Sequence, residues 1–171
     1  MKYTIHRDGS FDILGDSIRL HGCYPAMDGS ALRPLRVEAA DDAIVYLLSG
    51  GIARLSFRTD GERLAIDCSA DGLAGIHDLA PVGSAALEQA ENVYVQGFGM
   101  EGPSGCFALT EDAPASHGLT ALYTGERVLL VYAEDYRRYS AAFQAKKQRR
   151  RSESTFPFPV ASIWKARQAS G

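Results

Sequence analysis

Residues 52–68 read IARLSFRTDGERLAIDC, an alternating pattern that is interrupted once by an Asp-Gly pair. Before this pair, Ala53, Leu55 and Phe57 alternate with polar side chains, and after it apolar residues again take every second position. Successive side chains of a strand point to opposite faces, so a period of two predicts strands with one buried row. Because Asp-Gly also tolerates the positive φ angles of a tight turn, the stretch predicts a β-hairpin.

Similar runs, separated by turn residues, recur through most of the chain. Further Asp-Gly pairs stand at positions 8–9, 28–29 and 71–72. The run 128–132 is apolar on both faces, which predicts a strand in the middle of a sheet that is covered from both sides. Many short strands with glycine turns predict an all-β fold, an antiparallel β-sandwich of the supersandwich kind. Besides the hairpin, the expected strands cover residues 3–5, 11–13, 18–24, 43–48, 92–96, 106–110, 119–123 and 127–133.

Helical patterns are weak by comparison. Residues 85–92 predict one short helix of about two turns. Residues 140–151 contain good helix formers but little apolar surface beyond Phe143, so a helix there would be exposed. The following Phe156–Pro159 cannot continue a helix and predicts an extended tail. We therefore expect a β-sandwich domain over 1–139 and a basic helix with a Pro/Phe-containing linker or tail over 140–171.

The composition is that of a globular domain. The chain has 171 residues, of which 46% are hydrophobic and 23% charged, and this excludes a disordered or fibrous protein. It has neither an apolar run of about 20 residues nor the apolar core of a signal peptide, so we expect no membrane span and a cytoplasmic location. The three cysteines, Cys23, Cys68 and Cys106, are widely spaced, and no two of them form a C-x-x-C motif. This predicts buried free thiols rather than a zinc site.

Charge is distributed unevenly. Seven of the 18 positive side chains fall within residues 137–151, which contain no carboxylate, whereas the remaining 11 are accompanied by 21 carboxylates. A basic cluster is one mark of nucleic-acid binding, but the acidic remainder would repel phosphate and no aromatic residues interleave with the cluster's charges for stacking. We expect a solvated basic face and no nucleic-acid partner.

A glycine-rich stretch is the most unusual local feature of the sequence. Residues 97–102 match the G-x-G-x-x-G spacing of dinucleotide-binding loops, but Pro103 follows where a helix would have to begin. This excludes the cofactor interpretation, and no cofactor is expected. Five residues are expected to set the backbone conformation of this loop and to let it approach another surface closely: Gly97, Gly99, Gly102, Pro103 and Gly105.

Four side chains of the same loop are candidates for contact with a substrate or a partner: Gln96, Phe98, Glu101 and Ser104. Phe98 would offer an apolar face, and the other three would offer hydrogen bonds. The alternative is that Phe98 and Met100 close the end of the sandwich core. No catalytic residue is predicted, because the four histidines are scattered, and no metal ligands stand at helical spacing.

The segment 93–105, VYVQGFGMEGPSG, resembles a motif of the α-galactosidase and raffinose-synthase group of glycoside hydrolases. The runs 119–122 and 128–131, followed by Asp135–Tyr139 (DYRRY), resemble the end of the N-terminal β-sandwich in that group. The resemblance covers about residues 90 to 140. It implies a non-catalytic domain that precedes a (β/α)-barrel. The barrel's two catalytic aspartates would lie beyond Gly171, and nothing in this chain matches them.

Two functions follow from this resemblance. The first is an accessory β-sandwich of an α-galactosidase-like hydrolase, which contributes its loop to a galactoside-like carbohydrate or to the catalytic barrel. The second is a stand-alone carbohydrate-binding or protein-interaction module. Phe98 and Met100 stand where the family leads us to expect tryptophan, which weakens the case for stacking on a sugar there. Self-association of the chain stays open in both cases.

Overall fold

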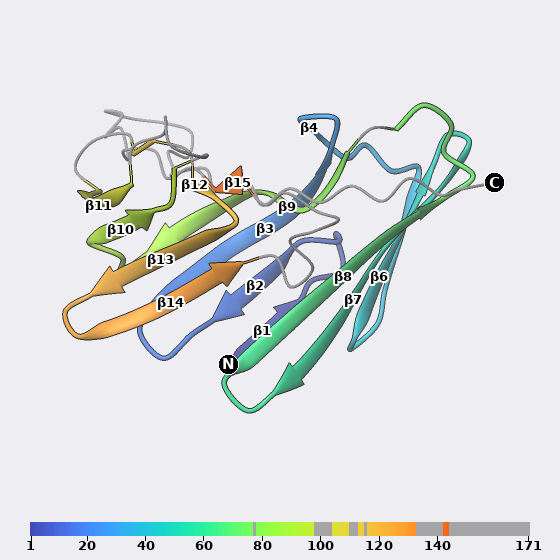
Figure 1. Ribbon diagram of the computed structural model, residues 1–171. Helices are drawn as coiled ribbons and strands as arrows, with labels where there is room; N and C mark the ends of the chain where they lie inside the picture. Colours follow the sequence, from blue (N-terminus) through green and yellow to red (C-terminus); the bar gives the residue numbers. More distant parts are fainter. Residues whose placement is uncertain (77, 98–103, 110–112, 115, 133–141, 144–171) are drawn as a thin grey trace, which may run out of the picture.

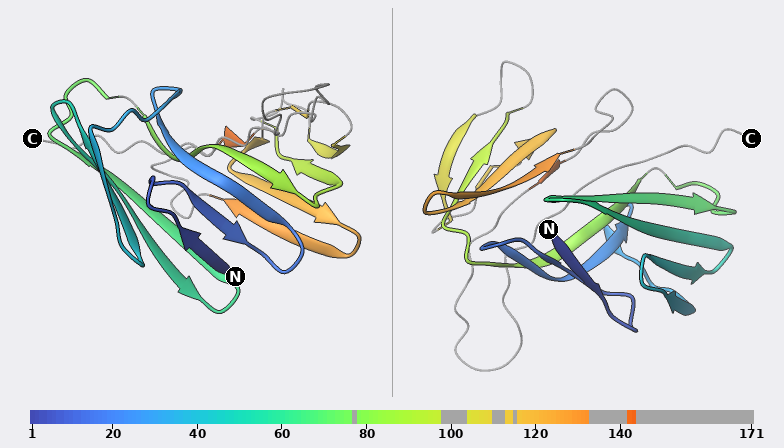
Figure 2. Two further views of the ribbon diagram at one scale, coloured as in Figure 1. Left: turned by 180° about the vertical axis from the view of Figure 1, so that it is seen from behind. Right: turned by 90° about the horizontal axis from the view of Figure 1, so that it is seen from below.

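The computed structural model describes residues 1–76, 78–97, 104–109, 113–114, 116–132 and 142–143. Within these residues the chain is built from β-strands, and it has no helix long and apolar enough to cross a membrane. Three main antiparallel sheets pack together, so the predicted all-β sandwich is confirmed. The first sheet lies between the other two, as seen from the front in Figure 1 and from behind in Figure 2.

The first sheet combines the start of the chain with a strand from its middle. Its members are β1 (Lys2–Ile5), β2 (Phe11–Leu14), β3 (Arg19–Met27), β4 (Ser30–Ala31) and β9 (Leu79–Glu88). β1 to β4 follow one another in sequence order, and β9 pairs with β3. The Asp8-Gly9 turn forms as predicted, with Gly9 at a φ of 86° and the Ser10 amide donating to Asp8 Oδ1 at 2.9 Å.

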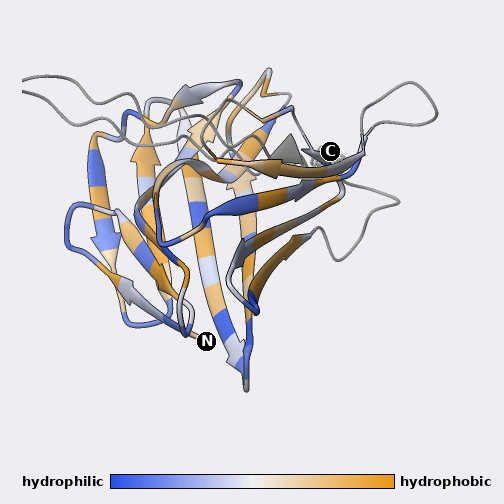
Figure 3. Ribbon diagram, turned by 90° about the vertical axis from the view of Figure 1, so that its left-hand side faces the viewer, coloured by the Kyte–Doolittle hydropathy of each residue, from blue (hydrophilic) through white to orange (hydrophobic). Residues whose placement is uncertain are grey.

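The second sheet is a meander of consecutive strands: β5 (Arg36–Ala39), β6 (Ala43–Leu48), β7 (Gly51–Asp60) and β8 (Arg63–Asp71). The predicted hairpin is β7 and β8, which pair from Ile52 opposite Asp71 to Asp60 opposite Arg63. The predicted inward row of β7 is buried, since Leu55 and Phe57 are at most 3% exposed. Figure 3 shows the corresponding alternation of hydrophobic and hydrophilic residues along several strands.

The third sheet has the order β11-β10-β13-β14, and a short ladder lies outside the three main sheets. The strands of the third sheet are β10 (Asn92–Val95), β11 (Gly105–Ala108), β13 (Leu119–Thr124) and β14 (Arg127–Tyr132), and the ladder joins β12 (Ser116–His117) to β15 (Ala142–Phe143). One hydrophobic core includes residues of all three sheets, among them Leu20, Leu55 and Leu122. Aromatic rings join the first two sheets, since Phe57 stacks on Tyr3 at 5.0 Å and meets Phe11 edge-on at 4.9 Å.

The two predicted helices are wrong where the structure describes them. Residues 85–88 belong to β9, whose Leu87 pairs with Leu20 of β3, and pairing with a buried partner outweighs the helix propensity of the alanines. The chain then turns at Gln89, which has a φ of 65°. Residues 142–143 form β15, and the rest of the basic segment lies outside the described residues. The expected boundary between 139 and 140 stays a prediction.

The expected position of the run 128–132 is also wrong. Among the described strands, β14 is at an edge of the third sheet, and Val128, Leu130 and Tyr132 are about half exposed. The strand covered on both faces is β9, where Leu79 to Val82 are four consecutive buried residues. An apolar run shows that a strand avoids charge, but it does not distinguish a central strand from an edge strand with one uncovered apolar face.

Candidate functional site

The base of the predicted glycine loop is held by one hydrogen bond between its two ends and one to β12. The Gly97 amide donates to Ser104 Oγ at 2.9 Å, and the Gln96 amide donates to Ser116 Oγ at 2.8 Å. Ser116 Oγ in turn donates to the Leu119 carbonyl at 2.6 Å. These bonds bring two of the predicted contact residues, Gln96 and Ser104, to one end of the third sheet, where both are exposed.

The remaining predicted loop residues, Phe98, Gly99, Glu101, Gly102 and Pro103, lie outside the described residues, so their proposed contacts stay predictions. Gly105 is described, and a Cβ added to it would meet no atom within 4 Å. The predicted role of the loop glycines stays a prediction.

The third sheet has an outer face that is largely apolar. Strand pairing places Tyr94 opposite Ala121 and Cys106, and it places Ala121 opposite Leu130. Residues directly opposite in an antiparallel pair share a face, so these side chains form one row. With the rows on either side, the outer face comprises Asn92, Tyr94, Cys106, Ala108, Leu119, Ala121, Tyr123, Val128, Leu130 and Tyr132.

The exposed large hydrophobic side chains of this outer face lie on β14. Val128, Leu130 and Tyr132 are 51%, 52% and 48% exposed, whereas Leu129 between them is buried. Among the described strands, β14 pairs only with β13. The backbone N–H and C=O groups along its outer edge therefore have no partner strand among the described residues. Natural edge strands are usually protected by Lys, Pro or a bulge, and the strand has none of these from Val128 to Tyr132. This combination is typical of a surface that binds another molecule.

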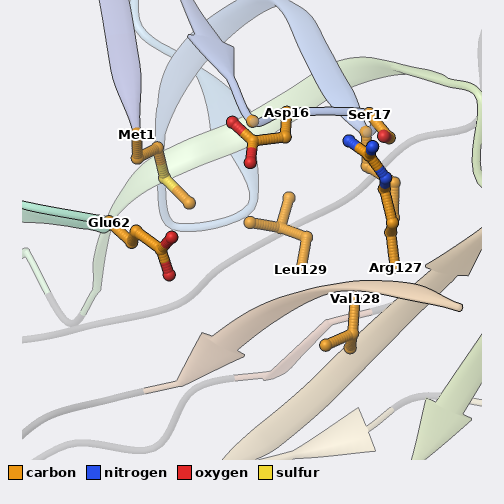
Figure 4. Close-up of a pocket in the computed structure, with 9 residues that line it drawn as sticks. Met1, Asp16, Ser17, Glu62, Arg127, Val128 and Leu129 are labelled. Carbon is orange, nitrogen blue, oxygen red and sulfur yellow. The ribbon is translucent and has the colours of Figure 1, made fainter.

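A cleft with a mixed polar and apolar lining lies beside the start of β14, where turns from all three sheets meet. Its volume is about 320 Å³, and its walls come from Met1, the β2–β3 turn, the β7–β8 turn and the start of β14. In Figure 4, Arg127 and Leu129 extend from β14 toward the turn at Asp16 and Ser17, whereas Val128 points to the other side of the strand. The cleft therefore lies mostly on the side of β14 away from the outer face, and Val128 is the residue that the two share.

Polar side chains also form a chain on the outside of the first sheet. Asp12 Oδ2 lies 3.2 Å from His6 Nε2 and 3.3 Å from His21 Nδ1, and His21 Nε2 lies 3.1 Å from Glu88 Oε2. Burial acts to raise the pKa of Asp12, but hydrogen bonds from the Gly22 amide and both imidazole rings outweigh it and lower this pKa. Both nitrogens of His21 are engaged by carboxylates, which favours a structural role in joining β2, β3 and β9.

The cysteines differ from one another in exposure. None of the three forms a disulfide within the described residues: Cys23 is buried as predicted, Cys68 is half-buried, and Cys106 is exposed on the outer face of the third sheet, so the prediction of a buried thiol is wrong there. Burial raises the pKa of the Cys23 thiol to about 12, so this thiol is protonated at neutral pH. Within the described ranges, no group of three His, Cys, Asp or Glu side chains is arranged to hold a metal ion.

Comparison with known proteins adds no relative: no family model, curated protein or solved structure matches the chain. The cleft and the outer face were not predicted from the sequence. The sequence signal that could have pointed to the cleft is that Asp16, Glu62 and Arg127 each lie at or beside a turn that contains glycine. Which turns meet in space depends on how the sheets pack, and local sequence patterns do not carry that information.

Proposed function

We propose that this chain is a non-catalytic β-sandwich that docks onto another protein domain through β14 and the outer face of the third sheet. The observation that carries this proposal is the exposure of Val128, Leu130 and Tyr132 on one edge strand. Burial of three such side chains and pairing of the free strand edge are both favourable on association.

The resemblance suggests the class of partner. The third sheet lies within residues 90–140, the region that resembles the α-galactosidase group, and in that group the sandwich precedes a catalytic barrel. An uncharged docking face is suited to an apolar patch on such a barrel, because the partner need not bury an unpaired charge. We therefore propose the barrel domain of an α-galactosidase-like hydrolase as the partner.

The proposal is tested by titrating this chain with a purified α-galactosidase-like barrel that lacks its own N-terminal sandwich, using isothermal titration calorimetry. We expect association, and we expect the double variant Leu130→Ser, Tyr132→Ser to weaken it at least tenfold, about 1.4 kcal/mol. Leu35→Ser is the matched control, because Leu35 is 76% exposed and lies outside the third sheet. Absence of association, or an equal loss in the control, would refute the docking function.

Carbohydrate contact is the second candidate, and the aromatic content of the same face supports it. Tyr94, Tyr123 and Tyr132 belong to the outer face, and Gln96 and Ser104 lie beyond its end. Aromatic rings with hydrogen-bonding groups beside them are suited to the apolar face and the hydroxyls of a sugar. A glycan array with wild type and Tyr94→Ala tests this candidate. Galactoside binding that is lost in the variant would support it, and an array without signal would exclude it.

A further inference from the structure

We propose that the cleft beside Arg127 is a binding site for a small polyhydroxylated carboxylic acid, of which a hexuronate is the simplest example. This site shares Val128 with the docking face, but the rest of its lining lies away from that face. The proposal depends on the shape of the cleft, on the position of Arg127 within it, and on the balance of charge around that residue.

The shape comes first. The cleft of about 320 Å³ continues into a wider, more open hollow of about 700 Å³, and the two share Ser17 and Arg127. Arg127 therefore stands between two hollows and is accessible from both. The floor of the first hollow includes Ile18 and Leu129, which are 2% and 6% exposed, so the site has a packed apolar base. Its volume is at the lower end of the range for small-molecule sites.

The position of Arg127 comes second. Four carboxylate residues line the two hollows: Asp16, Glu62, Glu91 and Glu126. Within the part of the chain that the structure describes, no ion pair joins any of them to Arg127. The guanidinium group thus keeps its planar set of donors for a ligand, and it is suited to a carboxylate that binds through both oxygens.

The charge balance identifies the ligand class. Asp16 and Glu62 line the first hollow together with Arg127 and Met1, whose amino group donates to the Gly61 carbonyl, so two carboxylates there accompany two cationic groups. A dianionic phosphate would add twice the excess negative charge of a single carboxylate. A single carboxylate on a hydroxyl-rich frame reduces this conflict, because the hydroxyls can donate hydrogen bonds to Asp16 and Glu62. In Figure 4, Glu62 lies on the far side of Leu129 from Arg127, and Asp16 lies above Leu129 between them.

The second hollow contains a strained residue. Gln89 lines it with a φ of 65°, a conformation that is uncommon for a residue other than glycine. Such strain persists only where the surrounding structure holds it, and it occurs often at ligand sites. The side-chain amide of Gln89 would extend the row of polar groups available to the ligand beyond Arg127.

The test is an NMR titration of the full ¹⁵N-labelled chain with D-glucuronate, D-glucose and inorganic phosphate. We expect glucuronate to shift the amides of Ser17, Glu62 and Arg127 with a Kd on the order of 1 mM, with glucose at least tenfold weaker and phosphate without effect. Arg127→Gln should weaken glucuronate binding at least tenfold, and Glu62→Gln severalfold. Arg54→Gln, an exposed substitution on β7 that lines neither hollow, should leave binding unchanged.

Three outcomes would overturn the proposal. The first is no glucuronate shift at about ten times the expected Kd. The second is binding that is unchanged in Arg127→Gln, and the third is phosphate binding as tight as that of glucuronate. Circular dichroism of each variant establishes that it is folded. A failure here leaves the docking function intact, because Leu130 and Tyr132 do not line the cleft.

Discussion

The hydroxyl of Tyr46 donates a hydrogen bond of 2.5 Å to the carbonyl oxygen of Gly9, and so the second sheet is joined to the first turn of the first sheet. Tyr46 is completely buried, and burial raises the pKa of its hydroxyl well above the ordinary value, so this group stays protonated and remains a donor at neutral pH. The two residues are 37 positions apart in the sequence.

Tyr46→Phe should lower the free energy of unfolding by about 1–3 kcal/mol, because it leaves the Gly9 carbonyl without its buried donor. Urea unfolding followed by circular dichroism measures the loss. Tyr24→Phe is the matched control: Tyr24 meets the Tyr46 ring edge-on at 5.9 Å, and this ring contact survives the substitution. An equal loss in both variants would show that the Tyr46 hydrogen bond contributes nothing specific.

Gly9→Ala should be more destabilising than Gly61→Ala, although both glycines have a positive φ. A Cβ at Gly9 would lie 2.8 Å from Tyr46 Cε1 and 2.9 Å from Val37 Cγ1, whereas a Cβ at Gly61 meets nothing within 4 Å. We expect Gly61→Ala to cost roughly 1–2 kcal/mol from backbone strain alone, and Gly9→Ala about 1–3 kcal/mol more from crowding. Equal losses in urea unfolding would contradict this difference.

Asp12→Asn should remove part of the pH dependence of stability. The pKa of Asp12 is lowered in the folded state, so its stabilising contribution is present at neutral pH and is lost as the pH falls through the folded pKa. At pH 7 we expect the variant to be less stable than wild type by roughly 1 kcal/mol, since Asn can still accept from the Gly22 amide.

Below about pH 4 the difference between Asp12→Asn and wild type should shrink, because a protonated Asp12 carries no charge either. Urea unfolding at a series of pH values measures this change. Asp60→Asn, at an exposed position beside the β7–β8 turn, is the control and should show a smaller effect. A difference that stays constant down to pH 2 would disprove the electrostatic explanation.

Thiol labelling should distinguish the three cysteines. A disulfide reagent at pH 8 should modify Cys106 rapidly and Cys23 only after unfolding, because Cys23 is buried and its pKa is raised to about 12. Mass spectrometry of peptides from the labelled protein measures the order. Docking of a barrel onto the outer face should also slow the labelling of Cys106. Labelling of Cys23 at the rate of Cys106 would contradict the packing of the first sheet.

Much of the fold could be predicted because its hairpins are local. The alternation in residues 52–68 specifies both a strand period and a turn, and no distant contact is needed to interpret it. The failures involve long-range contacts: residues 85–88 become a strand because β3 pairs with them, and β14 is an edge strand because no described strand follows it in the sheet. The cleft around Arg127 depends on three turns from distant parts of the sequence.

The pairing of β3 with β9 has a consequence for the order in which the protein folds. Arg19 pairs with Glu88, and the whole second sheet lies in the chain between these two partners. The hairpins of the second sheet close short loops, whereas the β3–β9 pairing has to close a loop of about 50 residues even at its nearest pair, Met27 with Leu79, which costs more chain entropy. During synthesis, therefore, we expect the second sheet to form while the first sheet still lacks β9. The segment inserted between β3 and β9 would then be folded before these two strands pair.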